Sequence, residues 1–331
     1  MWRGIQLFTE QTAYFYIFGQ SMKTDILSDK NIDFFQRCVK VAASTFPITT
    51  KVPSGISLHH YCSLSSLIGI IESSTIWTSN YKFMNDRSEG VYLLNSISKD
   101  HHQNLENEIE FIKKKSADIF IASFSEEKDD LYQWKLYGDS GKGVNIKFDF
   151  DHEGGTYLAM PIDLRETYSL EMPRFDLVKV NYNSNDQKEF FANLLRSFIN
   201  LKSEIENPEQ ERIFKKFLYR GIAGHSSLTK SEAWKNEKEW RLVGYYDNAN
   251  ADLEDMEKFQ HKDPLSFRLS SDNRLIPYYK YPIDVTQIKE IKFGPLNRNN
   301  FEGLENSMKT FFVTRGINPP KMSLSNIDLA Y

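Results

Sequence analysis

Four clusters of polar residues interrupt or end segments that otherwise have the pattern of β-strands. A polar group on a buried strand face costs free energy unless it is paired, so such interruptions point to a site. Their carboxylates and imidazoles are suited to acid–base chemistry, and their rings to binding flat ligands. The clusters are His59-His60-Tyr61; Asn85-Asp86 with Glu89; Ser123-Phe124-Ser125 with Trp134 and Tyr137; and Trp234 to Arg241, which includes Glu237 and Glu239.

The two glutamates of the last cluster give the clearest indication of chemistry. If a strand begins near Glu237, then Glu237 and Glu239 point to one face and Trp240 points to the other. Two carboxylates on one face repel each other, so they need solvent, a cation or a catalytic role. The competing interpretation is an exposed strand edge whose charges protect against aggregation.

Each of the other clusters has an ordinary structural interpretation beside a functional one. A histidine at the end of a strand is more often a satisfied structural residue than a catalytic one. Asn85 and Asp86 before a helix, with Glu89 in its first turn, match ordinary helix capping. Trp134 and Tyr137 are three residues apart, so on a helix they share a face. That face is either part of the core or a stacking platform.

Other kinds of site find little support in the sequence. His59 and His60 are neighbours that point apart on a strand, and the His101-His102 pair falls in a polar helix, so we expect no metal site. The glycine-rich phosphate-binding patterns and the G-x-S-x-G pattern are absent. Cys62 has no obvious base nearby except His60, so we expect it to be a small, inert, buried residue.

The composition excludes several classes of protein. The 331 residues include 41 Lys and Arg against 45 Asp and Glu, so the net charge of −4 gives no overall attraction to nucleic acid, although a local basic patch is compatible with it. No apolar run approaches 18 residues, and the short apolar stretch at 13–18 lacks a cleavage motif, so we expect neither a membrane span nor a secretory signal.

Two further features of the composition bear on compartment and core. The two cysteines, Cys38 and Cys62, cannot form a disulfide framework, which favours a reducing cytoplasm. Aromatic residues make up 14% of the chain, an excess that indicates a dense core, a ring-binding site or both.

The elements that must position the clusters follow from the apolar pattern. Segments rich in β-branched and aromatic residues, or with alternating apolar residues, predict strands at 58–62, 75–79, 119–124, 144–148, 240–246, 266–269 and 288–293. Strands and helices do not alternate strictly, so the pattern favours an α+β fold over a doubly wound parallel sheet.

The helical segments define the expected domain organisation. Residues 1–55 are expected to be a mostly helical N-terminal extension, and residues 56–331 a single α+β domain. Apolar spacing predicts a helix at 64–71 with Ser63 as its N-cap, and a helix near 301–315 before a last strand. A pair of helices at 187–224, separated by Asn207-Pro208, is expected to be an insertion into this domain.

Taken in order, these pieces resemble a bacterial family, the domain of unknown function 2971. The resemblance covers roughly residues 57–297 and consists of six short motifs, which are weak singly and specific together. The motifs are His60-Tyr61-Cys62-Ser63; Trp77-Thr78-Ser79 with Phe83-Met84-Asn85-Asp86 and Glu89; Ala122-Ser123-Phe124-Ser125; Trp134-x-x-Tyr137-Gly138 with Gly143; Trp234-x-x-Glu237-x-Glu239-Trp240-Arg241; and Ile291-Lys292-Phe293-Gly294-Pro295.

That family in turn resembles ADP-ribosyltransferases. Those enzymes place a histidine or arginine on the first core strand, a serine-containing or aromatic element on a middle strand and a glutamate on a later one. His60, Ser123 and Glu239 occur here in that order, and Glu237-x-Glu239 is similar to the E-x-E motif of arginine-modifying members. The segment around Trp77 lacks the full tyrosine motif of polymerase-type members, so the transferase class stays open. The resemblance implies a mixed or antiparallel β core, a split sandwich.

The resemblance also implies an activity. It implies cleavage of the N-glycosidic bond of NAD without a metal, and transfer of ADP-ribose to a macromolecular acceptor, a protein or a nucleic acid. The implied context is a cytoplasmic bacterial toxin or anti-phage effector, with an antitoxin or another regulatory protein as a partner. The alternatives are a non-catalytic nucleotide- or partner-binding module of the same fold, an NAD glycohydrolase, and a nucleic-acid processing enzyme.

The roles that the resemblance implies can be assigned to residues. Cleavage builds positive charge on the ribose, which a carboxylate stabilises, and we assign that role to Glu239. Glu237 is expected to position or deprotonate the acceptor, and His60 to bind a ribose hydroxyl. Arg241 is expected to pair with a neighbouring carboxylate. The full set of expected NAD-binding residues is His60, Tyr61, Ser63, Trp77, Ser79, Asn85, Asp86, Ser123, Phe124, Ser125, Trp134 and Tyr137.

Overall fold

The computed structural model describes residues 29–45, 55–83, 119–150, 175–245, 265–270 and 273–329. The predictions for Asn85, Asp86 and Glu89, and for the helix expected after them, lie outside these residues. So do the predictions for the His101-His102 pair.

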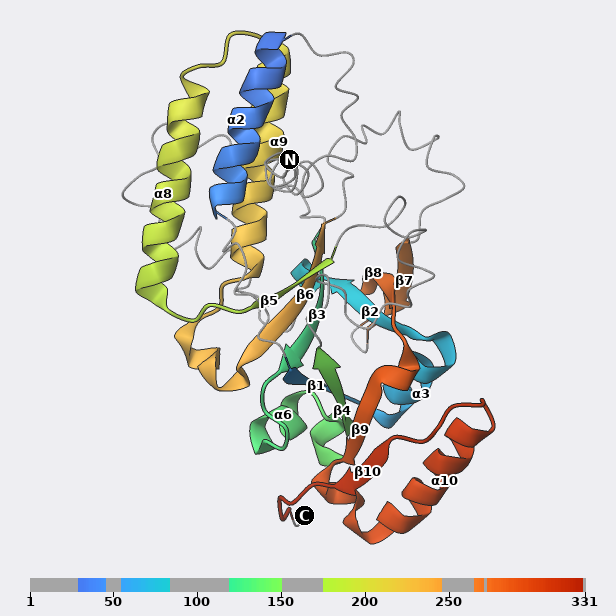
Figure 1. The fold of residues 1–331 in the computed structure, drawn as a ribbon. Coiled ribbons are helices and arrows are strands. Elements are labelled where there is room, and N and C mark those ends of the chain that lie inside the picture. Colours follow the sequence, from blue (N-terminus) through green and yellow to red (C-terminus); the bar gives the residue numbers. More distant parts are fainter. Residues whose placement is uncertain are drawn as a thin grey trace, which may run out of the picture.

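One mostly antiparallel sheet forms the body of the protein (Figure 1). In the described residues its ten strands are β1 (Ile56–Cys62), β2 (Thr75–Asn80), β3 (Ile119–Ser125), β4 (Val144–Phe150), β5 (Phe175–Lys179), β6 (Glu239–Tyr245), β7 (Leu265–Leu269), β8 (Leu275–Pro282), β9 (Ile288–Phe293) and β10 (Lys321–Leu324). The order is β10-β9-β4-β1-β3-β2-β8-β7. β6 branches from β3 and pairs with β5 on its other side, and among the described strands only β10 and β9 are parallel. The predicted α+β class is confirmed.

The sheet divides at β3. One edge of β3 pairs along its whole length with β6, from Ile119 opposite Tyr245 to Ser125 opposite Glu239. The other edge is shared, because β2 pairs with the residues around Ile121 whereas β1 pairs only with Ser125. Among the described strands, none pairs with residues 122–124 on this edge. The sheet therefore opens between β1 and β2, and the opening leaves room for a site.

Three long helices lie beside this sheet (Figure 1). They are α2 (Asp29–Thr45), α8 (Ser184–Lys202) and α9 (Pro208–Ser227). Their packing buries an aromatic-rich core that includes Phe34, Phe191, Phe198, Phe214 and Phe217. The predicted helical pair is confirmed. The described part of the predicted N-terminal extension packs against that pair.

Along the chain, shorter helices lie between the strands of the sheet. They are α3 (Leu64–Ser73), α6 (Leu131–Leu136), α10 (Phe301–Val313) and the 3-10 helices Tyr81–Phe83, Asp139–Gly141, Glu232–Glu237, Val285–Gln287 and Pro295–Asn300. Ser63 caps α3 as predicted, since its Oγ accepts a hydrogen bond from the amide of Ser66 at 3.1 Å.

Gly143 stands at a crowded junction between β1, β4 and β9. Its amide donates to the carbonyl of Gly138 and its carbonyl accepts from Gly294, both at 2.9 Å. A Cβ at this position would lie 2.2 Å from the carbonyl oxygen of Cys62 and 2.9 Å from that of Gly138. Both obstacles are backbone atoms, so the strands themselves would have to move.

We therefore expect Gly143→Ala to lower the free energy of unfolding by about 1–3 kcal/mol, the usual range for overpacking. Gly69→Ala is the matched control, because Gly69 lies inside α3 and nothing is within 4 Å of its added Cβ. Alanine there should stabilise the protein by roughly 0.5–1 kcal/mol. Urea unfolding curves measure both variants. Equal stabilities of the two variants would contradict the crowding argument.

Candidate functional site

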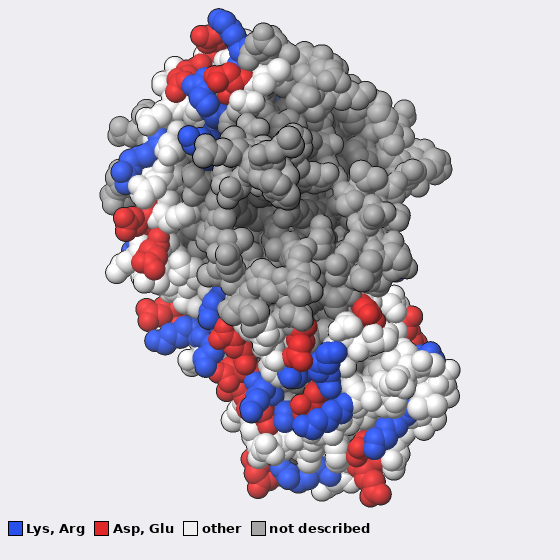
Figure 2. Space-filling view, viewed as in Figure 1, with Lys and Arg blue, Asp and Glu red and all other residues white. Residues whose placement is uncertain are grey.

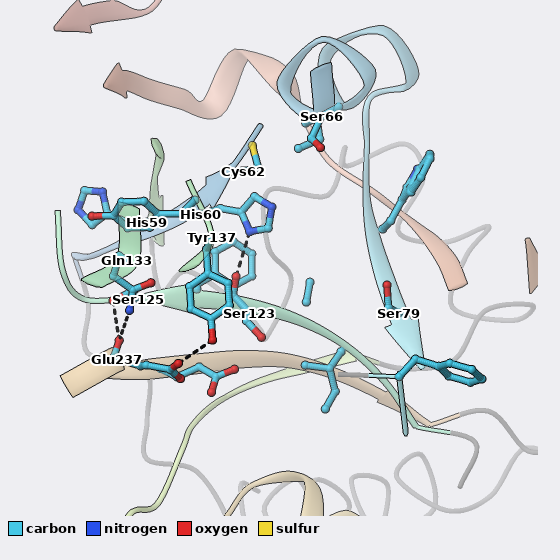
Figure 3. Close-up of a pocket in the computed structure, with 18 of the residues that line it drawn as sticks. His59, His60, Cys62, Ser66, Ser79, Ser123, Ser125, Gln133, Tyr137 and Glu237 are labelled. Atoms are coloured by element: carbon cyan, nitrogen blue, oxygen red, sulfur yellow. Dashed lines mark hydrogen bonds between the residues drawn. The ribbon is translucent and has the colours of Figure 1, made fainter. Parts of the chain in front are cut away.

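A cavity of about 620 Å³ opens where β1 and β2 diverge from β3 (Figure 3). Its volume lies in the range of small-molecule binding sites. Ten of the residues predicted from the sequence line it: His60, Tyr61, Trp77, Ser79, Ser123, Phe124, Ser125, Tyr137, Glu237 and Glu239. The structure therefore brings together strand segments that are up to 179 residues apart along the chain, from His60 to Glu239.

Two predicted residues do not line the cavity. Ser63 caps α3 instead. Trp134 is fully buried, donates from Nε1 to Asp129 Oδ1 at 2.8 Å and packs edge-on against Tyr61 at 4.8 Å between ring centroids. Trp134 is thus a core residue rather than a stacking platform. Asn85 and Asp86 lie outside the described residues.

His60 is fixed beside residues 122–124 of β3, the part of that edge with no partner among the described strands. Its Nδ1 lies 2.9 Å from the carbonyl oxygen of Ser123 (Figure 3). Because a carbonyl only accepts, Nδ1 carries the hydrogen and Nε2 is left as an acceptor. Burial lowers the pKa of His60 below its ordinary value, which favours this neutral form. His60 therefore presents an acceptor suited to a hydroxyl group.

The backbone of Ser123 faces the opening of the sheet. Its carbonyl accepts from His60, and in a strand the amide of a residue points to the same side as its carbonyl. The buried hydroxyl of Ser123 lies beside Glu239 and helps to lower the pKa of that carboxylate. Among the described residues, however, this hydroxyl makes no hydrogen bond of normal geometry.

Glu237 and Glu239 are buried beside two cations. Lys230 Nζ lies 2.6 Å from Oε2 of Glu237 and 3.2 Å from Oε2 of Glu239. Arg241 binds both carboxylate oxygens of Glu239, with Nε at 2.9 Å from Oε1 and Nη2 at 3.0 Å from Oε2. The predicted pairing of Arg241 with a neighbouring carboxylate is confirmed. The alternative of an exposed, charged strand edge is wrong, because only 2% of Glu237 and 4% of Glu239 is exposed.

The local backbone that places Glu237 and Glu239 side by side differs from the predicted strand. The strand begins at Glu239, whereas Glu237 ends a 3-10 helix and Lys238 between them has a left-handed backbone with φ of 44°. The carbonyl of Glu237 accepts from Ser125 Oγ at 2.6 Å and from Gln133 Nε2 at 3.3 Å (Figure 3). Tyr137 OH donates to Oε1 of Glu237 at 2.6 Å. Glu237 is thus held by its backbone as well as by its side chain.

The surroundings push the pKa values of the two carboxyl groups apart. Burial raises the pKa of Glu237, and the charge of Glu239 adds to that effect against the opposing Lys230. Burial acts in the same direction on Glu239, but Arg241 and Lys230 outweigh it and hold its pKa below the ordinary value. Such divergence is typical of a pair with separate roles, one a fixed anion and one a proton carrier.

The other end of the cavity is aromatic and cationic. Trp77 is 44% exposed and stacks on Tyr278, with 4.3 Å between ring centroids and 27° between the planes. Arg268 lines the cavity, and its Nη2 donates to Ser79 Oγ at 3.1 Å. Sequence reasoning missed Arg268, and it also missed Lys230 and Gln133 at the glutamate end.

Burial raises the pKa of the Cys62 thiol to about 12, which agrees with an inert residue. No group of three or more His, Cys, Asp or Glu side chains in the described segments is arranged to hold a metal ion. None of the described helices has the length and apolarity needed to cross a membrane.

The surface shows the charge distribution beyond the cavity. On the face in Figure 2, the described Lys and Arg side chains are interspersed with Asp and Glu side chains. We see no large region of one sign among the described residues of that face. The described part of this face therefore offers no continuous basic track for the backbone of a nucleic acid.

Fold and site together define an α+β protein with a buried polar cavity at a division of its sheet. Residues 133–242 match the model of a family described as protein of unknown function (DUF2971), which confirms the predicted resemblance over that segment. The matched segment is about a third of the chain and includes Tyr137, Glu237, Glu239 and Arg241. No curated protein and no solved structure matches the chain.

Proposed function

We propose that this protein is an NAD-dependent ADP-ribosyltransferase that transfers ADP-ribose to a macromolecular acceptor. The observation that carries the proposal is the convergence of His60, Ser123 and Glu239 on one cavity, from three separate strands. The divergence of β1 and β2 from β3 also supports an ADP-ribosyltransferase-like split β core. A bacterial toxin or anti-phage effector of the cytoplasm, controlled by a regulatory protein, is the context that we propose with it.

The proposed reaction has two stages, loss of nicotinamide and attack by the acceptor. The bond between the ribose C1′ and the nicotinamide nitrogen breaks, and its electron pair leaves with neutral nicotinamide. Positive charge develops on the ribose and is stabilised by the Glu239 carboxylate, which its cationic neighbours keep ionised. A nucleophile of the acceptor then bonds to C1′, and its proton passes to Glu237, whose raised pKa favours accepting it.

Neighbouring residues hold these groups in place. His60 Nε2 accepts a hydrogen bond from a ribose hydroxyl, while its Nδ1 stays on the Ser123 carbonyl. Arg241 donates to both oxygens of Glu239, so the carboxylate is already held in place before NAD binds. Each carboxylate oxygen has two acceptor positions, so a ribose hydroxyl can still donate to Glu239.

A second candidate is a binding module of the same fold that holds a nucleotide without turnover. One observation favours it: the Glu239 carboxylate is already neutralised by Arg241 and Lys230. Nearby cations reduce the attraction of a carboxylate for a developing positive charge. An NAD glycohydrolase, with water as the acceptor, would use the cavity in the same way as the transferase.

Incubation of the purified full chain with NAD separates these candidates. Nicotinamide release is measured with no acceptor, with protein and with nucleic acid, and NAD labelled in the adenosine part reports where ADP-ribose goes. Release together with labelled protein or nucleic acid supports the transferase. Release with free ADP-ribose alone supports the glycohydrolase. Absence of release under all three conditions contradicts both and leaves the binding module.

We expect Trp77→Ala to weaken NAD binding by about tenfold, because stacking of a base on an aromatic ring contributes on the order of 1–3 kcal/mol. Trp77 lines the cavity with an exposed ring that is suited to stack on a nicotinamide or adenine ring. Phe267→Ala is the control, since that ring is 56% exposed and does not line the cavity. Calorimetric titration with NAD compares the two, and equal affinities would remove Trp77 from the site.

A further inference from the structure

The two ends of the cavity differ in charge. Glu237 and Tyr137 lie at one end, and Ser79 lies across the cavity on β2 (Figure 3). At the glutamate end the cations Lys230 and Arg241 are matched by two carboxylates. At the Ser79 end, the cation among the described lining residues is Arg268.

The strand pairing explains how Arg268 reaches the cavity. On β7, Arg268 lies opposite Ile276 of β8, and on β8 Tyr278 lies opposite Ser79 of β2. Residues directly opposite each other, and residues two apart on one strand, share a face of the sheet. Arg268, Tyr278 and Ser79 therefore lie on one face, and so does Trp77. The neighbours of Arg268 on β7, Phe267 and Leu269, are 56% and 68% exposed on the opposite face.

Among the described residues, Arg268 has few partners for a cation in a cavity wall. In the part of the chain that the structure describes, its hydrogen-bond partner is the neutral hydroxyl of Ser79, and no carboxylate forms an ion pair with it. A guanidinium carries five N–H donors in a planar fork, which matches the oxygens of a phosphate. A half-buried guanidinium without a counter-ion favours an anionic ligand.

We propose that Arg268 binds the pyrophosphate of a nucleotide ligand, with Ser79 orienting its guanidinium. The inference rests on the proposed function, since it assigns one end of the same cavity to the part of NAD that links the two ribose groups. The stacked pair of Trp77 and Tyr278 shares a face with Arg268, so a flat ring attached to that pyrophosphate has a surface nearby. Arg268 thereby selects phosphate-bearing nucleotides over nucleosides.

Titration of the full chain with ADP-ribose and with adenosine tests this assignment. For Arg268→Gln we expect an affinity for ADP-ribose about tenfold lower than in the wild type, the order expected for a charge-assisted hydrogen bond. The affinity for adenosine, which has no phosphate, should stay the same. Arg268→Lys should recover part of the loss, because it keeps the charge without the fork.

Arg274→Gln is the matched control, since Arg274 lies on the same β7–β8 hairpin, is exposed and does not line the cavity. Thermal unfolding of all variants checks that each substitution leaves the fold intact. If Arg268→Gln binds ADP-ribose as the wild type does, or if the wild type does not bind it, the assignment is overturned. Nicotinamide release by the wild type is scored separately. Arg268-dependent binding without release would keep the phosphate site and reject the transferase.

Discussion

Glu239→Gln is expected to lower the rate of nicotinamide release from NAD by about 10²–10³-fold, the loss typical when one preorganised electrostatic contact to a transition state is removed. The substitution keeps the size of the side chain, but it replaces one of the two accepting carboxylate oxygens with an NH2 donor. It removes the negative charge that lies beside His60 and Ser123 in the cavity. The loss should appear in kcat, because the positive charge on the ribose develops only in the transition state.

The same substitution leaves Arg241 and Lys230 with one carboxylate fewer, so its effect on folding has to be separated from its effect on chemistry. Urea unfolding and ADP-ribose affinity provide that separation. Glu126→Gln is a matched control, because Glu126 is also a carboxylate held by a lysine and by Trp240 Nε1, but it does not line the cavity. A folded Glu239→Gln variant that releases nicotinamide at the wild-type rate would refute the role of Glu239.

Local patterns were enough to predict most of the sheet but not β5 or β8. The strands β1, β2, β3, β4, β6 and β9 all carry runs of apolar, aromatic or β-branched residues. β8 contains Pro277 and Pro282, and proline argues against a central strand because it lacks an amide hydrogen. The pairing of β8 with β2 runs only from Tyr278 to Pro282, so both prolines stand at the limits of that ladder. The β2–β8 ladder therefore does not depend on these prolines, but that pairing cannot be recognised from the sequence of β8 alone.

Only those parts of the candidate site that depend on the spacing of residues within one segment were predictable from the sequence. The spacing of Glu237 and Glu239 predicted that they would share a face and need solvent, a cation or a catalytic role. The identity of one cation, Lys230, depends on a turn that brings a residue after α9 back to the start of β6. Arg268 enters the cavity through two strand pairings, β7 with β8 and β8 with β2. Contacts of this kind come from tertiary pairing, so no local pattern indicates them.

The second large effect is expected in stability, and it concerns Arg241. This guanidinium is completely buried, binds both oxygens of Glu239 and donates to the carbonyl of Ser227. Its substitution by methionine leaves the buried Glu239 carboxylate without its bidentate partner. We therefore expect Arg241→Met to lower the free energy of unfolding at neutral pH by about 3–5 kcal/mol.

Two comparisons separate this effect from a general cost of removing an arginine. Arg212→Met removes an exposed partner of Glu209 on α9, and it should change stability by no more than about 1 kcal/mol. In the double variant Glu239→Gln with Arg241→Met, the uncompensated charge is gone. The double variant should therefore lose less unfolding free energy than the sum of the losses in the two single variants, and a double-mutant cycle measures the difference.

The dependence on pH gives the sharpest form of this prediction. In the wild type the pKa of Glu239 lies below its ordinary value of 4.5, so its stabilising contribution is present above that pH and declines as the pH falls below it. Without Arg241, the effect of burial is opposed mainly by Lys230, so the pKa of Glu239 should rise. Protonation of Glu239 at low pH then removes the uncompensated charge and part of the destabilisation. The difference in unfolding free energy between wild type and Arg241→Met should consequently be largest near pH 7 and shrink toward pH 4. Urea unfolding at several pH values measures it, and a difference that stays constant or grows with acidity would show that Arg241 does not act through the charge of Glu239.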